Sequence, residues 1–188
     1  MKKIITLITG LGFTLLSPVV MAHDSHLSNS LFSGMLHPVV GIDHLIALIL
    51  GGILIARLNN RQCIVTGSVT MALVLGAVGA VIIGNQTWIQ SAWVEAAILF
   101  SIPLYVFLLW IQKSSQTLSI TLMSLFMVAH GWAHGIEIVS SYHGMNHFLD
   151  NISFMSGFLL TCLTIVTFSN IITTSIINNT YLKNHATH

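Results

Sequence analysis

The sequence predicts an all-α membrane protein, a polytopic bundle of about five transmembrane helices that follows a cleaved signal peptide. Hydrophobic residues make up 54% of the 188-residue chain and charged residues only 6%, whereas a soluble domain carries about 25% charged residues. The apolar residues form runs of about 20, the length that a helix needs to cross a bilayer. Strands of a membrane barrel would instead alternate apolar and polar residues over about 10 positions.

The N-terminal segment has the pattern of a secretory signal peptide. Two lysines precede an apolar run over 4–16, and a small-residue cleavage site ends at Ala22. We therefore predict that residues 1–22 are removed and that the mature chain begins at His23, outside the cytoplasm. An uncleaved first helix is the alternative, and it would leave the following residues on the same side of the membrane.

The rest of the chain, residues 23–188, is predicted to be one transmembrane domain, because no linker divides it. Five stretches are long and apolar enough to span a bilayer: 36–57, 64–84, 92–111, 118–137 and 152–174. Every Lys and Arg of the mature chain follows the first, third or fifth stretch: Arg57, Arg61, Lys113 and Lys183. Because positive residues favour the cytoplasmic side, we predict an outer N-terminus and a cytoplasmic C-terminus.

The first span begins with the segment His37-Pro38-Val39-Val40-Gly41-Ile42-Asp43-His44. Pro38 suits the first position of a helix, where its missing N–H is no loss. On a continuous helix, His37 and His44 would share a face about 10 Å apart along the axis. Asp43 beside His44 could orient the imidazole or bind a metal ion itself.

The fourth span contains His130, His134 and Glu137, which are related by steps of i, i+4 and i+7. These three side chains are predicted to share one face of the helix. Two imidazoles four residues apart can chelate a divalent metal, and the carboxylate would add a third ligand. Gly131 and Gly135 have the same spacing and permit close approach of a neighbouring helix.

The two segments are expected to meet in the outer half of the bilayer, because the first span runs inward and the fourth runs outward. Ionisable groups inside a membrane usually mark a substrate path. Any one of them alone could be a hydrogen-bonded or solvated residue, so the prediction rests on the set. The predicted metal ligands are His37, Asp43, His44, His130, His134 and Glu137, and the candidate accessory ligands are Glu95, His23, His26, His143 and His147.

At these two motifs the chain resembles the HupE/UreJ family of nickel permeases. The family motif H-x5-D-H corresponds to 37–44, and F-H-G-x-[A/V]-H-G-x-E corresponds to 129–137, with Ala129 in place of the leading Phe. The resemblance covers nearly the whole chain. It implies secondary uptake of nickel or cobalt across the bacterial inner membrane for hydrogenase or urease, with no tightly bound cofactor. Many members have a further helix after the one equivalent to 152–174, whereas the tail here is short and polar.

The chemistry of the ligands leaves other functions open. Imidazole and carboxylate suit nickel, cobalt, zinc and copper(II) alike. An intramembrane zinc-dependent hydrolase, with Asp43 or Glu137 as general base, is one alternative to a permease. A b-type haem protein with axial histidines is another. Besides the metal ion, we expect membrane lipid as a partner, leave a homo-oligomer open, and exclude nucleic acid because the sequence has no basic patch.

Overall fold

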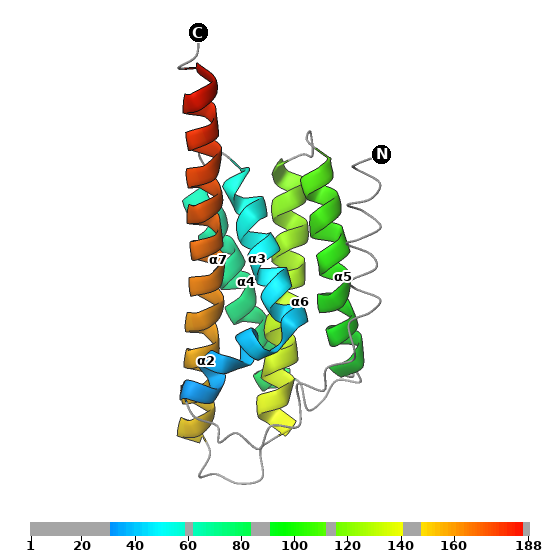
Figure 1. Ribbon diagram of the computed structural model, residues 1–188. Coiled ribbons are helices and arrows are strands. Elements are labelled where there is room, and N and C mark those ends of the chain that lie inside the picture. The colour runs from blue at the N-terminus through cyan, green and yellow to red at the C-terminus, as the bar shows by residue number, and fades with distance from the viewer. Residues whose placement is uncertain (1–30, 59–61, 84–90, 112–115, 141–147, 186–188) are drawn as a thin grey trace.

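The computed structural model describes residues 31–58, 62–83, 91–111, 116–140 and 148–185, and within these ranges it describes no side chains at 91–92, 137–140, 148–151 and 183–185. The described residues form six α-helices: α2 (Leu31–Val40), α3 (Ile42–Ala56), α4 (Gln62–Ile83), α5 (Ser91–Trp110), α6 (Gln116–Ser140) and α7 (Phe148–His185). Helices α3 to α7 run alongside one another as a bundle, and α2 lies across one end of it (Figure 1). The predicted all-α fold is confirmed.

The first predicted span, 36–57, is not one continuous helix, so the expectation of a single helix there was wrong, although the two helices together are still long and apolar enough for one span. The axes of α2 and α3 are bent by 81° at Gly41, whose backbone is extended with φ −72° and ψ 97°. Glycine loses more conformational entropy in a helix than any other residue, which favours a break here. Pro38 lies inside α2 rather than at a helix start, and its ring removes one helical hydrogen bond just before the break.

Helices α4 and α6 cross closely because glycines face the partner backbone. A Cβ atom added to Gly131 would overlap the carbonyl of Leu73, and one added to Gly135 would lie 2.5 Å from the carbonyl oxygen of Ala77. The predicted close approach at these two glycines is therefore confirmed, and the neighbour is α4. Small residues are the usual means of bringing membrane helices this near.

Three of the described helices contain a segment that is long and apolar enough to cross a membrane: Gln62–Ile83, Trp93–Trp110 and Ile152–Leu182. The bent pair of α2 and α3 would form a fourth span. Helix α6 has 25 residues but is not among these segments, and His130 and His134 lower its hydropathy. The count of five spans and their orientation remain predictions, as does the signal peptide, which lies outside the described residues. Helix α7 continues beyond 174 to His185, so the polar tail extends that helix.

The packed core lies between α3, α4, α5, α6 and α7. Its most buried side chains include Leu48, Ile55, Tyr105, Met123 and Phe158. Large apolar side chains also cover the outside of the bundle, among them Ile64, Leu75, Phe100, Leu125 and Phe168. A soluble protein rarely exposes contiguous apolar surface on this scale, so the exposed side chains agree with a lipid environment.

Candidate metal site

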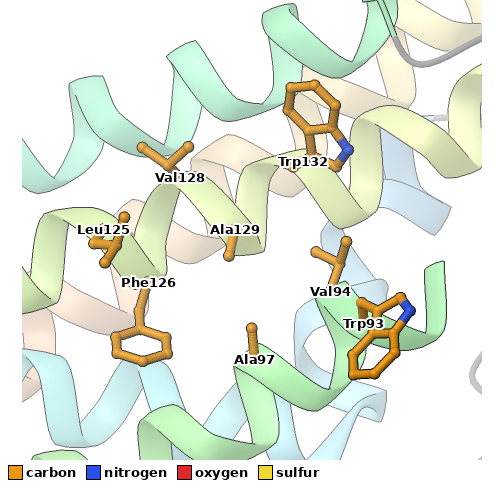
Figure 2. Close-up of a pocket in the computed structure, with 8 residues that line it drawn as sticks. All are labelled: Trp93, Val94, Ala97, Leu125, Phe126, Val128, Ala129 and Trp132. Atoms are coloured by element: carbon orange, nitrogen blue, oxygen red, sulfur yellow. The ribbon is translucent and has the colours of Figure 1, made fainter. Parts of the chain in front are cut away.

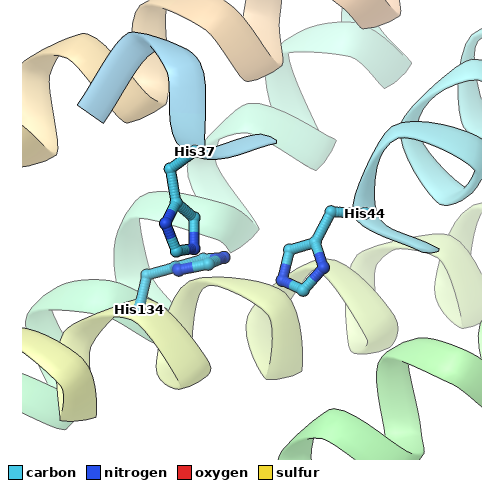
Figure 3. A group of neighbouring side chains, drawn as sticks. All are labelled: His37, His44 and His134. Atoms are coloured by element: carbon cyan, nitrogen blue, oxygen red, sulfur yellow. The ribbon is translucent and has the colours of Figure 1, made fainter. Parts of the chain in front are cut away.

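Four histidine rings meet where the bend between α2 and α3 faces α6. The centroid of the His37 ring lies 4.7 Å from that of His134, and the centroid of the His44 ring lies 4.7 Å from that of His130. His44 and His134 are 5.0 Å apart by the same measure. Ligand nitrogens of His37, His44 and His134 all lie within 4.8 Å of one another (Figure 3). These three side chains come from three helices, α2, α3 and α6.

The break at Gly41 produces this arrangement. A straight helix would separate His37 and His44 by about 10 Å along its axis, but their ring centroids are only 6.0 Å apart. The predicted separation was therefore wrong, because the chain changes direction between the two residues. Both rings now face the pair of histidines on α6, which is what a single shared ion requires.

The cluster is almost entirely shielded from solvent. The exposed fractions of His44, His130 and His134 are 2%, 2% and 1%, while His37 is partly buried. The Nε2 atoms of His44 and His130 have no hydrogen-bond partner among the described residues. Buried polar atoms are nearly always satisfied, and each exception calls for an explanation. A metal ion bound by these nitrogens would supply one.

Asp43 orients the ring of His44. The Nδ1 atom of His44 lies 3.0 Å from the Oδ1 atom of Asp43. A carboxylate in this position accepts a hydrogen bond from Nδ1–H, which leaves the lone pair on Nε2 for a ligand. The sequence left open whether Asp43 orients the imidazole or binds the metal ion itself. For a metal ion bound at Nε2 of His44, the geometry favours the orienting role.

Glu95 on α5 joins a second group of possible ligands. Ligand atoms of Asp43, His44 and Glu95 lie within 4.8 Å of one another. The sequence suggested Glu95 only as an accessory ligand, since it stands alone near one end of its span. Its place beside Asp43 depends on the packing of α5 against α3, which no local pattern reveals.

Two phenylalanines of α7 form an apolar wall beside the histidines. The ring centroid of Phe158 lies 4.0 Å from that of His134, and Phe154 lies 5.7 Å from His37. Sequence reasoning missed both residues, because a phenylalanine in an apolar span gives no signal of its own. Their effect is to keep water away from the buried imidazoles, which strengthens electrostatic interactions there.

Several predicted site residues lie outside the described part of the chain. Glu137 belongs to α6, but its side chain is not described, and the outer residues His23, His26, His143 and His147 fall outside the described ranges. Of the six predicted ligands, the structure therefore brings together five: His37, Asp43, His44, His130 and His134.

Two grooves lie away from the cluster. One, of about 370 Å³ between α5 and α6, is lined by apolar residues such as Trp93, Phe126 and Trp132 (Figure 2), and its lining includes no imidazole or carboxylate. The other, of about 680 Å³, has a polar lining that includes Arg57 and Gln62. It lies at the end of α3 opposite to the bend, so the bundle has one histidine-rich end and one basic and amide-rich end.

Comparison with known proteins gives one match. A family model described as HupE / UreJ protein matches residues 11–186, a range that includes both histidine segments. No curated protein and no solved structure matches the chain.

Proposed function

We propose that this chain, which belongs to the HupE/UreJ family, is a secondary permease that carries nickel across the bacterial inner membrane. The family is associated with nickel and cobalt transport. Helices of membrane-spanning length and composition agree with a multi-pass membrane protein. Nickel is the proposed substrate, cobalt its expected competitor, and a hydrogenase or urease the proposed recipient.

The observation that supports this proposal most strongly is the convergence of three imidazoles from three helices. The ligand nitrogens of His37, His44 and His134 are within 4.8 Å of one another. Imidazole binds first-row divalent ions at about 2.1 Å, so two nitrogens on one ion are at most about 4.2 Å apart. A small closure of the rings is enough to bind an ion. Because the ligands come from different helices, movement of the helices can also release it.

The proposed orientation puts the histidine cluster on the periplasmic side. Arg57 lies at the opposite end of α3, where its Nη1 atom donates a hydrogen bond to the carbonyl of Leu109 at 2.8 Å. Positive residues favour the cytoplasmic side of a membrane. The ion would therefore enter at the cluster and leave near the polar groove that contains Arg57 and Gln62. The mature N-terminus would be periplasmic and the C-terminus cytoplasmic.

The energy for uptake would come from an ion gradient or from trapping of the metal in the cytoplasm. The sequence contains no GxxxxGK[ST] motif for binding a nucleotide. In this proposal the metal is a substrate that passes through the protein, and the chain is not an enzyme. The alternative of a zinc-dependent hydrolase requires an ion that stays bound during turnover.

Uptake of radioactive nickel by cells tests the proposal. Cells that produce the chain should accumulate nickel faster than cells without it, with competition by cobalt stronger than by zinc. His134→Ala should reduce uptake to the background of cells without the protein. His185→Ala, at the far end of α7, is the matched control and should leave uptake unchanged.

Membrane insertion separates loss of transport from loss of protein. Removing an imidazole from an apolar helix makes insertion easier, so the amount of His134→Ala protein in the membrane should be no lower than that of the wild type. Normal uptake by this variant would contradict the proposal. So would nickel that stays bound to the purified protein during hydrolysis of a lipid or peptide.

A further inference from the structure

His44 belongs to two groups of possible ligands and is their only common member. One group contains His37, His44 and His134, and the other contains Asp43, His44 and Glu95. The first offers three imidazoles, whereas the second offers two carboxylates and one imidazole. The two groups therefore have different affinities for water, protons and metal ions.

The two nitrogens of His44 face different groups. Its Nδ1 atom is 3.0 Å from the Oδ1 atom of Asp43. Its Nε2 atom is buried and has no hydrogen-bond partner among the described residues. In Figure 3, one ring nitrogen of His44 points toward His37 and His134 while the other points away from them. Since Nδ1 is engaged by Asp43, the nitrogen that points toward the other histidines is Nε2.

The two groups also differ in burial. The side chain of Asp43 is 25% exposed, and Glu95 is partly buried as well. In the other group His37 is partly buried, but His134 is buried, so that group has one partly exposed ligand where the carboxylate group has two. An ion that arrives from solvent therefore reaches the carboxylates first. Carboxylates suit a hydrated divalent ion, whereas three imidazoles in an apolar setting suit an ion that has lost most of its water.

We propose that the protein has two successive positions for the cation, an outer one at Asp43 and Glu95 and an inner one at His37 and His134, and that His44 passes the ion between them. This inference rests on the proposed permease function and adds the order in which the ligands act. Two carboxylates neutralise the charge of the incoming divalent ion. The imidazoles then replace its remaining water molecules.

The two positions cannot both use His44 at the same time. A neutral imidazole has one proton and one lone pair. When Nδ1 binds the ion in the outer position, the proton is on Nε2. When the ion moves to Nε2, that proton passes to a water molecule that leaves the ion, and Nδ1 takes one proton from the solvent beside the partly exposed Asp43, which accepts its hydrogen bond. The ring keeps one proton in both states, so the chain holds one His44-bound ion at a time.

Binding of Co²⁺ to the purified, full-length chain in detergent tests this order. Co²⁺ in an imidazole-rich site of low coordination number absorbs visible light more strongly than Co²⁺ in an oxygen-rich octahedral site. Binding is counted relative to a triple variant, H44A/E95Q/H134A, so that ions at any other residues are subtracted. The wild type should bind one ion per chain with the stronger, imidazole-rich spectrum.

The two positions should respond separately to substitution. H134A should still bind one ion, about tenfold more weakly and with the weaker, oxygen-rich spectrum. E95Q should keep the imidazole-rich spectrum with an affinity within about threefold of the wild type, yet lose about tenfold of nickel uptake at low metal concentration. S101A is the control on α5, because its hydroxyl bonds only to the carbonyl of Ile98 in the described structure. It should change neither measurement.

Other outcomes would overturn the inference. If H134A binds no cobalt, or if E95Q alters the spectrum as H134A does, the ligands form one site and not two. H134Q repeats the measurement if the alanine variant does not elute as a single species. If the wild-type protein binds no cobalt and takes up no nickel, the proposed permease function is wrong. If the wild type transports nickel but the variants give either of the two results above, only the proposal of two positions is wrong.

Discussion

The two segments that carry the histidines reach the same site by different means. On α6, the histidines lie four residues apart on a continuous helix, and their ring centroids are 5.3 Å apart. In the segment of α2 and α3, the histidines lie seven residues apart and meet because the chain bends by 81° between them. The regular helix of α6 sets the distance between the first two rings, whereas the break at one glycine sets the distance between the second two. Sequence spacing is a reliable guide to geometry only where the helix continues.

The largest expected effect is on nickel uptake, and it is measured by removing one imidazole from the bent segment and, separately, one from α6. His44→Ala should reduce nickel uptake at least about 100-fold, more than the roughly 10–100-fold that loss of an indirect partner costs. His130→Ala should have the smaller effect, because its ring contacts His44 but it belongs to neither three-ligand group. Uptake assays at subsaturating nickel measure both. Equal losses would mean that His130 binds the ion as directly as His44 does.

The next effect, competition with protons, tests whether the two segments hold the same ion. Metal binding needs neutral imidazole, and the reference pKa of histidine is about 6.5. Nickel affinity should therefore fall as the outside pH is lowered from about 7.5 to about 5.5. Histidines from both segments acting together should give a slope of log Kd against pH steeper than one.

A slope of one or less would indicate a single imidazole ligand and would separate the two segments. Uptake that rises steadily on acidification would contradict the prediction in another way. It would indicate a symporter driven by protons, in which Asp43 or Glu137 carries the proton and not the metal.

A third prediction tests whether the contact with α4 holds α6 in place. A methyl group at Gly131 would overlap the carbonyl of Leu73 on α4, and a backbone atom cannot move aside without separating the helices. Gly131→Ala should therefore cost about 1–3 kcal/mol of stability, seen as a lower unfolding temperature in detergent. Gly67→Ala is the matched control on α4, because its added methyl group would meet nothing within 4 Å. A stable Gly131→Ala protein would show that the contact with α4 does not hold α6 in place.

The smallest effect concerns the bend itself. A Cβ atom at Gly41 would lie 3.2 Å from Nδ1 and 3.3 Å from Cγ of His44, so the ring must shift by a few tenths of an ångström. Gly41→Ala should weaken metal binding about threefold to tenfold and leave the amount of folded protein unchanged. Gly51→Ala on α3 is the control, since its methyl group would make only an ordinary contact with Met127. Unchanged affinity for Gly41→Ala would mean that the ring position tolerates the shift.

The sequence predicted the fold class and the α6 pair because both follow from local rules. Apolar runs specify helices, and an i, i+4 spacing brings two rings together wherever a helix continues. The bend was missed because Pro38 was taken as a helix start and Gly41 as an ordinary helical position. The neighbours of the histidines from α5 and α7, Glu95 and Phe158, depend on how helices pack, and a single sequence carries little information about that.

The break at Gly41 has an electrostatic consequence for the group beside it. A helix that starts inside the bundle presents unpaired amides and a positive dipole end, and α3 starts here with Asp43 in its first turn. The amides stabilise the carboxylate, whose partner among the described residues is the imidazole of His44 and not a lysine or arginine. A buried aspartate that was neutralised by a lysine or arginine would present no net charge to an approaching cation. Backbone dipoles leave the charge of Asp43 intact, so the bend allows an anion to persist at the point where a cation must be attracted.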